Sequence, residues 1–210
     1  MQGTSNTEQL SGLYAITDCS ANDSGLLFKQ VESALDAGLR LLQYRNKNAD
    51  ANLLLTQAKT LRKLCHQYAA QLIINDNIEL AKIIHADGVH LGRDDPSIHL
   101  ARQQLGKQAI VGVSCYNSLP LAFDAQHQGA SYVAFGSFFA SPTKPEAVPA
   151  SPELLESWRE QPTPACAIGG ITLNNAANLT RHGADMLAVI SDLWRSENIH
   201  QQTRDYLSLF

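Results

Sequence analysis

The chain has few cysteines, and none of them form closely spaced pairs. Its four cysteines, Cys19, Cys65, Cys115 and Cys166, are scattered, and no CxxC pair occurs. Zinc sites and disulfide frameworks depend on closely spaced cysteines, so both are disfavoured, and each free cysteine is best explained as a small buried residue. Because disulfides persist mainly in oxidising compartments, the pattern predicts a cytoplasmic protein.

Basic clusters and long apolar runs are also lacking. The net charge is −4 at pH 7, and no run of lysine and arginine stands out. Nucleic-acid binding rests on such clusters, so no nucleic-acid partner is expected. No apolar run is long enough to span a bilayer, and the first ten residues lack both a basic start and an apolar stretch, so we expect neither a membrane span nor a signal peptide.

The sequence does contain enough apolar residues for one sizeable core. Hydrophobic residues make up 44% and charged residues 17% of the 210 positions, which is a globular composition. This length suits one domain better than two. We therefore expect a flexible tail over residues 1–10 and a single catalytic domain over residues 11–210. The oligomeric state is left open, and a homo-oligomer is compatible with the sequence.

Short apolar runs alternate with longer amphipathic stretches along the chain. Strands are predicted at Leu13–Asp18, Leu39–Lys47, Leu72–Asn75, Gly88–Leu91, Ile110–Tyr116, Tyr132–Phe139, Ala165–Ile168 and Met186–Ile190. Helices are predicted at Leu26–Ala37, Ala51–Ala69, Ile78–His85, Ile98–Leu105, Leu119–Gln128, Pro152–Gln161, Asn174–His182 and Asn198–Leu209. Eight strands each followed by a helix predict an α/β protein, a (β/α)8 TIM barrel. A doubly wound sheet would gather polar residues at one switch point, whereas here they follow nearly every strand.

The second predicted strand ends in the polar segment Gln43-Tyr44-Arg45-Asn46-Lys47. Side chains alternate along a strand, so Gln43, Arg45 and Lys47 share one face. Two cations and an amide on an apolar strand are costly unless that face meets water or an anion. Arginine can bind phosphate oxygens through two hydrogen bonds and lysine adds a point charge, so we predict an anion site. The alternative is a solvated strand end.

Carboxylates follow the next two predicted strands. Asp76 comes directly after Ile73-Ile74-Asn75, and Asp94 and Asp95 follow the strand that begins at Gly88. Neighbouring strands lie about 4.8 Å apart, so carboxylates at their ends can share one cation. A small set of oxygen ligands suits Mg²⁺, which takes further ligands from water and substrate phosphate. The alternative is that these aspartates cap the helices that follow them.

Three further segments supply smaller polar features. Gly112 and Ser114 share one face of the fifth strand, where the glycine leaves room for a ligand and Ser114 can donate a hydrogen bond. Gly169 and Gly170 follow the seventh strand, where barrels often bind phosphate through backbone N–H groups. His90 is better explained as a hydrogen-bonded strand histidine than as a metal ligand.

The longest predicted loop follows the sixth strand. It covers Ala140–Pro152 and contains Ser141-Pro142-Thr143-Lys144. Loops that follow barrel strands form the active-site face, and two hydroxyls and a lysine suit a lid that adds charge when it closes. The alternative is a proline-rich surface turn.

These segments, in this order, resemble the thiamine-phosphate synthase family. The resemblance extends from about Gly12 to about Leu193 and is carried by Gly12–Asp18, Gln43–Lys47 (QxRxK), Ile74–Asp76 (IND), Ala86–Gly92 (ADGVHLG), Val111–Ser114, Pro142–Lys144 and Ala167–Ile171. It implies a transferase that condenses hydroxymethylpyrimidine diphosphate with hydroxyethylthiazole phosphate. The products would be thiamine phosphate and diphosphate, the latter lost in a dissociative step assisted by Mg²⁺.

The resemblance also implies a role for each site residue. Pyrimidine diphosphate would be bound by Gln43, Tyr44, Arg45, Asn46, Lys47, Asn75, Ser114 and Lys144. Thiazole phosphate would be bound by Ser141, Pro142, Thr143, Gly170, Ile190 and Ser191. Asp76 and Asp95 would hold Mg²⁺, and the catalytic residues would be Arg45, Lys47, Ser114 and Lys144. The sequence departs from the family pattern at Arg93, Cys115, Ser137 and Ala140.

Two other functions are compatible with the same barrel. One is a thiazole tautomerase-like enzyme, and the other is a catalytically silent protein that binds thiamine precursors. The tautomerase-like enzyme predicts the loss of the diphosphate and metal residues, and the silent protein predicts the loss of the metal ligands. Here Arg45, Lys47, Asn75, Asp76 and Asp95 all remain, which favours the synthase.

Overall fold

A computed structural model of the chain describes residues 10–19, 23–140 and 149–210, in which strands and helices alternate. The strands are β1 (Gly12–Ile16), β2 (Leu41–Tyr44), β3 (Gln71–Asn75), β4 (Gly88–Leu91), β5 (Ile110–Tyr116), β6 (Tyr132–Phe135), β7 (Ala165–Ile168) and β8 (Met186–Val189). The helices are α1 (Ser24–Asp36), α2 (Ala51–Gln67), α3 (Ile78–Ile83), α4 (Ile98–Leu105), α5 (Leu119–His127), α6 (Glu153–Trp158), α7 (Leu173–Arg181), α8 (Ser191–Trp194) and α9 (Ile199–Leu207).

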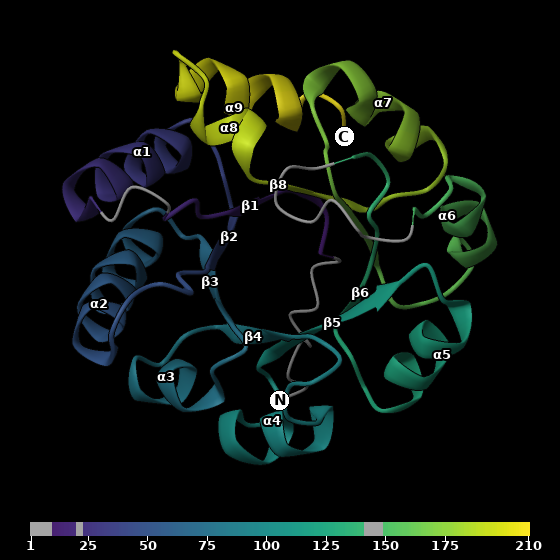
Figure 1. Cartoon of the computed structure of the whole chain (residues 1–210), viewed down its shortest axis with the longest axis horizontal. Helices are drawn as coiled ribbons and strands as arrows, with labels where there is room; N and C mark the ends of the chain where they lie inside the picture. The colour runs from purple at the N-terminus through teal and green to yellow at the C-terminus, as the bar shows by residue number, and fades with distance from the viewer. Residues whose placement is uncertain (1–9, 20–22, 141–148) are drawn as a thin grey trace, which may run out of the picture.

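The strands form one closed parallel barrel in chain order. Each strand pairs with the next, and β8 pairs with β1 in the register Gly12↔Met186. Figure 1 shows the strands as an inner ring and the helices as an outer ring. The predicted (β/α)8 barrel is therefore confirmed. None of the helices in the described ranges combines the length and apolar character that a membrane span requires.

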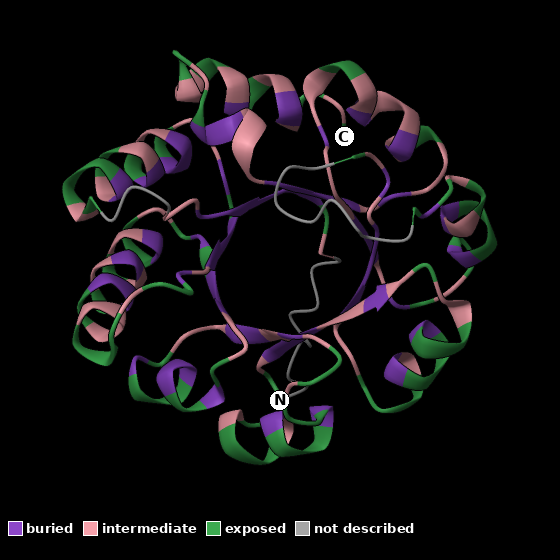
Figure 2. Ribbon diagram, viewed as in Figure 1, coloured by how far each residue is buried: buried purple, intermediate pink, exposed green. Residues whose placement is uncertain are grey.

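Strand alternation divides the apolar side chains into two layers. Leu13 and Ala15 of β1 belong to the layer between strands and helices, whereas Tyr14 and Ile16 belong to a smaller cluster inside the barrel. Figure 2 shows buried strands and helices whose buried residues face the barrel, with exposed residues on the outside. The barrel interior is thus a packed floor, and polar residues gather where the strands end.

Two predicted strands extend at least three residues beyond the carboxyl ends of the observed strands. The second was expected to reach Lys47 but ends at Tyr44, because the next residue leaves the ladder: the Arg45 N–H donates to Thr17 Oγ1 at 2.9 Å, and Thr17 donates to the Arg45 carbonyl at 3.1 Å. The sixth was expected to reach Phe139 but ends at Phe135. In both, the extra residues form loops at the carboxyl end of the barrel.

The helix α8 was not predicted. It covers only four residues, too few to give a periodic apolar pattern. Trp194 anchors it, because its buried indole N–H donates to the carbonyl of Ile16 at 2.6 Å. A contact between α8 and β1 thus fixes the backbone that follows β8.

Candidate active site

A large pocket opens at the carboxyl ends of the strands. Its volume is about 1290 Å³, which exceeds the roughly 300–1,000 Å³ typical of a pocket for one small ligand. Each strand contributes to its lining, from β1 to β8 through Tyr14, Gln43, Asn75, His90, Ser114, Ala134, Cys166 and Ala188. This is the face on which barrel enzymes carry their active sites.

The basic segment after β2 sends alternate side chains in different directions. Gln43, Arg45 and Lys47 all line the large pocket, as the alternation predicts. Tyr44 and Asn46 do not line it: both donate to Gln57 Oε1 of α2, at 2.6 and 3.1 Å. These two residues instead border a smaller pocket of about 290 Å³ next to it. The structure therefore separates three of the five predicted ligand-binding residues from the other two.

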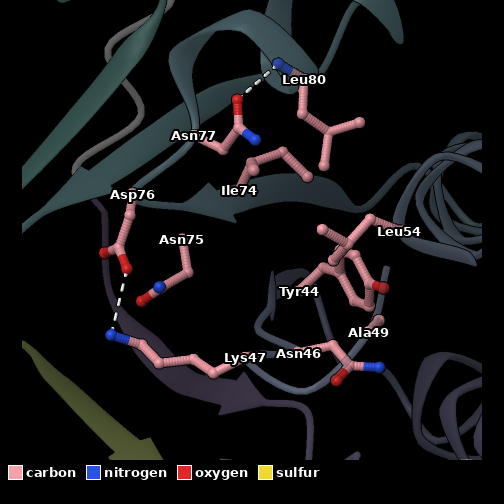
Figure 3. A pocket seen from close by; sticks show the side chains of 10 residues that line it. All are labelled: Tyr44, Asn46, Lys47, Ala49, Leu54, Ile74, Asn75, Asp76, Asn77 and Leu80. Carbon is pink, nitrogen blue, oxygen red and sulfur yellow. Dashed lines mark hydrogen bonds and ion pairs between the residues drawn. The ribbon is translucent and has the colours of Figure 1, made fainter. Parts of the chain in front are cut away.

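Lys47 and Asp76 lie between the two pockets and face each other. Figure 3 shows the lysine reaching across toward the carboxylate, with Asn75 beside them. Lys47 Nζ lies 3.2 Å from Asp76 Oδ2, and the two side chains are 59% and 34% exposed. An ion pair this exposed adds little to stability, so a ligand can replace either partner at small cost.

Neither predicted metal ligand serves as a helix cap. The cap of α3 is Asn77, whose Oδ1 accepts from the Leu80 N–H at 2.8 Å, and the cap of α4 is Ser97. The capping alternative is therefore wrong for both Asp76 and Asp95. Asp76 has φ +64°, a left-handed conformation that is uncommon outside glycine. Its backbone N–H donates to the His90 carbonyl at 2.9 Å, which holds the residue in this turn.

Asp76 and Asp95 line the same large pocket from adjacent strands. Asp95 Oδ2 accepts a hydrogen bond of 2.6 Å from the Gly92 N–H, which orients the carboxylate. Across the described ranges, no three or more His, Cys, Asp or Glu side chains are grouped as a metal cage. Two carboxylates in an open pocket fit Mg²⁺, which is commonly held by one or two carboxylates together with water and substrate phosphate.

The face of β5 behaves differently from the prediction. Gly112 was expected to leave room for a ligand, but a Cβ atom there would lie 2.0 Å from the ring of Tyr132. That room is therefore filled by a tyrosine of β6. Ser114 does line the pocket, and its Oγ lies 2.9 Å from His90 Nε2. His90 Nδ1 lies 2.9 Å from the Tyr132 hydroxyl, so the prediction of a hydrogen-bonded strand histidine is confirmed.

The opposite side of the pocket is built from the ends of β7 and β8. Gly169 and Gly170 line it together with Ile190 and Ser191. The glycines have φ +106° and +61°, and a Cβ at Gly170 would lie 2.5 Å from the Ala140 carbonyl oxygen, so glycine is required for this close approach. The Asn175 amide donates to the Gly170 carbonyl at 3.0 Å and fixes the turn.

Four predicted site residues, Ser141, Pro142, Thr143 and Lys144, lie outside the described residues. Three of the departures from the family pattern, Arg93, Ser137 and Ala140, line the pocket. Arg93 places its guanidinium 4.8 Å from the ring centre of Tyr116, which is a cation–π contact. Both Arg93 and Tyr116 line the pocket.

Sequence reasoning missed two tyrosines inside the barrel. Tyr14 and Tyr132 are buried, and their hydroxyl groups lie 2.8 Å apart. Burial raises the pKa of both phenols well above the ordinary value, so both remain protonated at neutral pH. Tyrosine in the middle of an apolar strand was the available signal, since a buried phenol needs a hydrogen-bond partner.

No described cysteine is suited to nucleophilic catalysis. Cys166 lines the pocket, but burial raises the pKa of its thiol far above the usual range. Burial likewise raises the pKa of Cys65 and Cys115 to about 12. Since the thiolate is the reactive form, these residues are packing elements. The chemistry of the pocket therefore rests on cations, carboxylates, amides and hydroxyls.

The chain is similar to known proteins over most of its length. A family model described as thiamine monophosphate synthase matches residues 13–193. The thiamine-phosphate synthase of Azoarcus sp. (strain BH72) is 50% identical over 204 residues, 97% of this chain and 98% of that protein. That of Marinobacter nauticus is 48% identical over 192 residues, 91% of this chain and 86% of that protein. The solved thiamine phosphate pyrophosphorylase from Pyrococcus furiosus has 33% identity and a TM-score of 0.84, with 94% of each chain covered.

Proposed function

The chain belongs to the thiamine monophosphate synthase family, and from this premise we propose how its pocket carries out the reaction. It is a transferase of thiamine biosynthesis that condenses hydroxymethylpyrimidine diphosphate with hydroxyethylthiazole phosphate. The products are thiamine phosphate and diphosphate. The proposal concerns the residues that bind each substrate, the use of Mg²⁺ and the way in which diphosphate leaves.

One observation carries the proposal. A single pocket of about 1290 Å³ holds cations and carboxylates on the side of β2 to β4 and a glycine pair on the side of β7. The volume suits two substrates at once. The two sides suit two different phosphate groups, one near charged side chains and the other near backbone N–H groups.

The diphosphate is assigned to the charged side. Arg45 offers a planar set of donors that fits phosphate oxygens, and Lys47 lines the same pocket. To bind phosphate, Lys47 needs to break only its exposed ion pair with Asp76. Gln43, Asn75 and Ser114 add neutral donors around them. Tyr44 and Asn46 act indirectly in this proposal, because their bonds to Gln57 hold the backbone on which Arg45 and Lys47 are mounted.

Mg²⁺ is assigned to Asp76 and Asp95, with the remaining ligands from the diphosphate and water. When bound, the ion supplies positive charge to the oxygens of the departing diphosphate. The two carboxylates hold the ion, and Lys47, displaced from Asp76, keeps its charge at the same end of the pocket.

The thiazole phosphate is assigned to the opposite side. Gly170 permits close approach of the backbone, and Ile190 and Ser191 face the same space where β8 ends. Ser141, Pro142, Thr143 and Lys144 complete this proposal on the resemblance alone. Lys144 would add a cation to the diphosphate, and the other three would contact the thiazole.

The proposed mechanism is dissociative. The bond between the pyrimidine methylene carbon and the diphosphate breaks first, and the thiazole nitrogen then bonds to that carbon with its own lone pair. Such a reaction needs stabilisation of negative charge on the leaving group, which Arg45 and Lys47 are positioned to give. It needs no general base, and the pocket offers no activated thiol that would suit a covalent route. Four free cysteines are consistent with a cytoplasmic enzyme, which we also propose.

The two alternatives are not favoured. A thiazole tautomerase-like barrel would have lost the diphosphate and metal residues, and a silent binding protein would have lost the metal ligands. Arg45, Lys47, Asn75, Asp76 and Asp95 are all present, and all of them line one pocket.

The decisive experiment is a product assay with both substrates, with and without Mg²⁺. We expect thiamine phosphate and diphosphate in stoichiometric amounts with the metal. Removal of Mg²⁺ by a chelator should reduce turnover by a hundredfold or more, roughly, since metal stabilisation of a phosphate charge amounts to several kcal/mol. Addition of excess Mg²⁺ serves as the control and should restore the rate. If folded protein with Mg²⁺ forms no thiamine phosphate, the proposed function is wrong.

A further inference from the structure

A continuous chain of hydrogen bonds crosses the barrel beneath the pocket. The Gln43 amide nitrogen donates to the Tyr14 hydroxyl at 2.7 Å, and the Tyr14 and Tyr132 hydroxyls lie 2.8 Å apart. The Tyr132 hydroxyl lies 2.9 Å from His90 Nδ1, and His90 Nε2 lies 2.9 Å from Ser114 Oγ. The chain therefore joins five side chains from β1, β2, β4, β5 and β6.

The interior of the barrel is shaped to hold this chain. Gly112 provides the space for the Tyr132 ring, because any Cβ there would overlap it at 2.0 Å. The Tyr132 ring stacks on His90 at a centroid distance of 5.6 Å and meets Tyr14 edge-on at the same distance. Gln43, Tyr14 and Tyr132 are all buried, so breaking a link leaves a polar group without water to replace it.

One set of directions leaves neither buried tyrosine hydrogen without an acceptor in the chain of hydrogen bonds. The Gln43 amide nitrogen donates to the Tyr14 oxygen, and the single Tyr14 hydrogen goes to the Tyr132 oxygen. In this set the Tyr132 hydrogen goes to His90 Nδ1. A neutral His90 ring then carries its hydrogen on Nε2 and donates it to Ser114 Oγ.

The other end of the chain is the surface of the pocket. In this set of directions Ser114 Oγ accepts from His90, which leaves the hydroxyl hydrogen of Ser114 free to point elsewhere. Within the described part of the chain, Oγ makes no second hydrogen bond, and Ser114 lines the pocket. Chains of this kind also strengthen each bond by polarising the next one.

We propose that Tyr14, Tyr132 and His90 are positioning residues that fix the Ser114 hydroxyl as a hydrogen-bond donor toward an anionic oxygen in the pocket. They do so by holding His90 in the tautomer that carries its hydrogen on Nε2. That the anionic oxygen belongs to the departing diphosphate rests on the function proposed above. A Ser114 hydroxyl that donates its hydrogen stabilises negative charge that develops next to it. The chain of hydrogen bonds therefore prepares this part of the pocket for a leaving anion.

The tautomer of His90 gives a test that needs no substrate. Nitrogen NMR of protein with labelled imidazole rings distinguishes the two neutral forms, and His90→Gln identifies the His90 signals among those of the seven histidines. We expect a single tautomer with hydrogen on Nε2 in the unmodified protein. Tyr132→Phe keeps the ring but removes two links, and should release His90 into a mixture of forms.

Tyr206→Phe is the matched control for this substitution. Tyr206 is also buried, and its hydroxyl donates to Asp192 at 2.6 Å, yet it does not belong to the chain of hydrogen bonds through His90. Asp192 keeps its bond from Gln202 in this variant, and the His90 spectrum should not change. A single tautomer with hydrogen on Nδ1, or an unchanged spectrum in Tyr132→Phe, would overturn the proposal. Should Tyr132→Phe not fold, Tyr14→Phe breaks the chain one link earlier and is expected to give the same mixture.

Binding of inorganic diphosphate in the presence of Mg²⁺ tests the outcome at Ser114. Ser114→Ala should weaken binding about tenfold, the effect of one hydrogen bond to a charged group. Tyr132→Phe should weaken binding in the Ser114 background but have no further effect when Ser114 is alanine, because it acts through that hydroxyl. Additive effects would overturn the proposal. If the tautomer is as expected but no thiamine phosphate forms, the proposed role of the hydrogen-bond chain is supported and the proposed reaction is wrong.

Discussion

At the scale of single residues, Asp76 combines an uncommon backbone conformation with a place in the pocket. Its φ of +64° is a conformation in which aspartate and asparagine are enriched among non-glycine residues, and its side chain faces Lys47. The helix that follows is capped by its neighbour Asn77. Asp76 therefore adopts an uncommon backbone conformation although it does not cap α3, which indicates that this conformation has a functional role.

Asp76→Asn should separate function from stability. Asparagine suits the same backbone conformation and keeps the side-chain shape but loses the charge that would hold Mg²⁺. We expect turnover to fall by about a hundredfold or more, with the melting temperature within a degree or two, roughly, of the unmodified protein. Steady-state kinetics at saturating Mg²⁺ and thermal unfolding provide the two measurements.

Asn77→Ala serves as the opposite variant. It removes the cap of α3 and should destabilise the protein by about 1 kcal/mol, or roughly 2–4 °C in melting temperature, while turnover stays close to normal. If Asp76→Asn instead behaves like this variant, the carboxylate has a structural role and the metal assignment fails.

Residue types on alternating strand positions were enough to predict most of the pocket. Gln43, Arg45 and Lys47 were expected on one face and do line the pocket together. The buried chain through Tyr14 and Tyr132 was not foreseen, because its links join strands that are far apart in sequence. The periodicity of a sequence predicts the face of a strand on which a residue lies. It does not predict which other residue this one contacts across a closed barrel.

At the scale of elements, the turn after β7 gives the sharpest prediction. In Gly170→Ala the new Cβ would lie 2.5 Å from the Ala140 carbonyl oxygen and 2.8 Å from Phe139 Cβ, so the loop must move. We expect the KM for hydroxyethylthiazole phosphate to rise about tenfold, the effect of one lost hydrogen bond to a charged phosphate. The KM for the pyrimidine diphosphate should change much less.

Gly129→Ala controls for the backbone alone. Gly129 has φ +87°, and nothing lies within 4 Å of the position of its Cβ. Both alanine variants should lose about 1–2 kcal/mol of stability from the left-handed conformation. Only Gly170→Ala should alter substrate binding. An equal rise in the KM for both substrates, or the same kinetics in both variants, would remove Gly170 from the phosphate site.

The existence and order of the main elements were predictable, whereas the ends of strands were less so. The alternation of side-chain directions continues past Tyr44, yet the ladder of β2 stops there because Thr17 bonds to the backbone of Arg45. The side chain of Thr17, directly after the neighbouring strand β1, thus decides where β2 ends. The short helix α8 depends in the same way on Trp194 meeting β1.

At the scale of the whole molecule, the buried tyrosines predict a limit to stability at high pH. The folded-state pKa of Tyr14 and of Tyr132 is raised by burial, while in the unfolded chain each phenol titrates near about 10. The folded state then holds these protons more tightly. Their contribution to stability is fully present below about pH 10 and is lost as the pH rises toward the folded-state pKa values.

Denaturant unfolding at a series of pH values measures this effect. Above about pH 10, the free energy of unfolding should fall by about 1.4 kcal/mol per pH unit for each of the two tyrosines. Tyrosinate absorbance from these residues should emerge only together with unfolding. The variant with both changed to phenylalanine should lose this part of the slope. Ionisation of all six tyrosines near about pH 10 in folded protein would contradict the expectation.

Because every strand contributes residues to the pocket, activity requires the complete, closed barrel. Tyr14 and Gln43 come from the first quarter of the barrel, His90 and Ser114 from its middle, and Gly170 and Ser191 from its last quarter. A fragment that carries only β1 to β4 would contain most of the charged side but none of the glycine side after β7, and it should be inactive. Two complementary half-barrels should regain activity only by reassembling, so enzyme rate would serve as a direct measure of ring closure during folding.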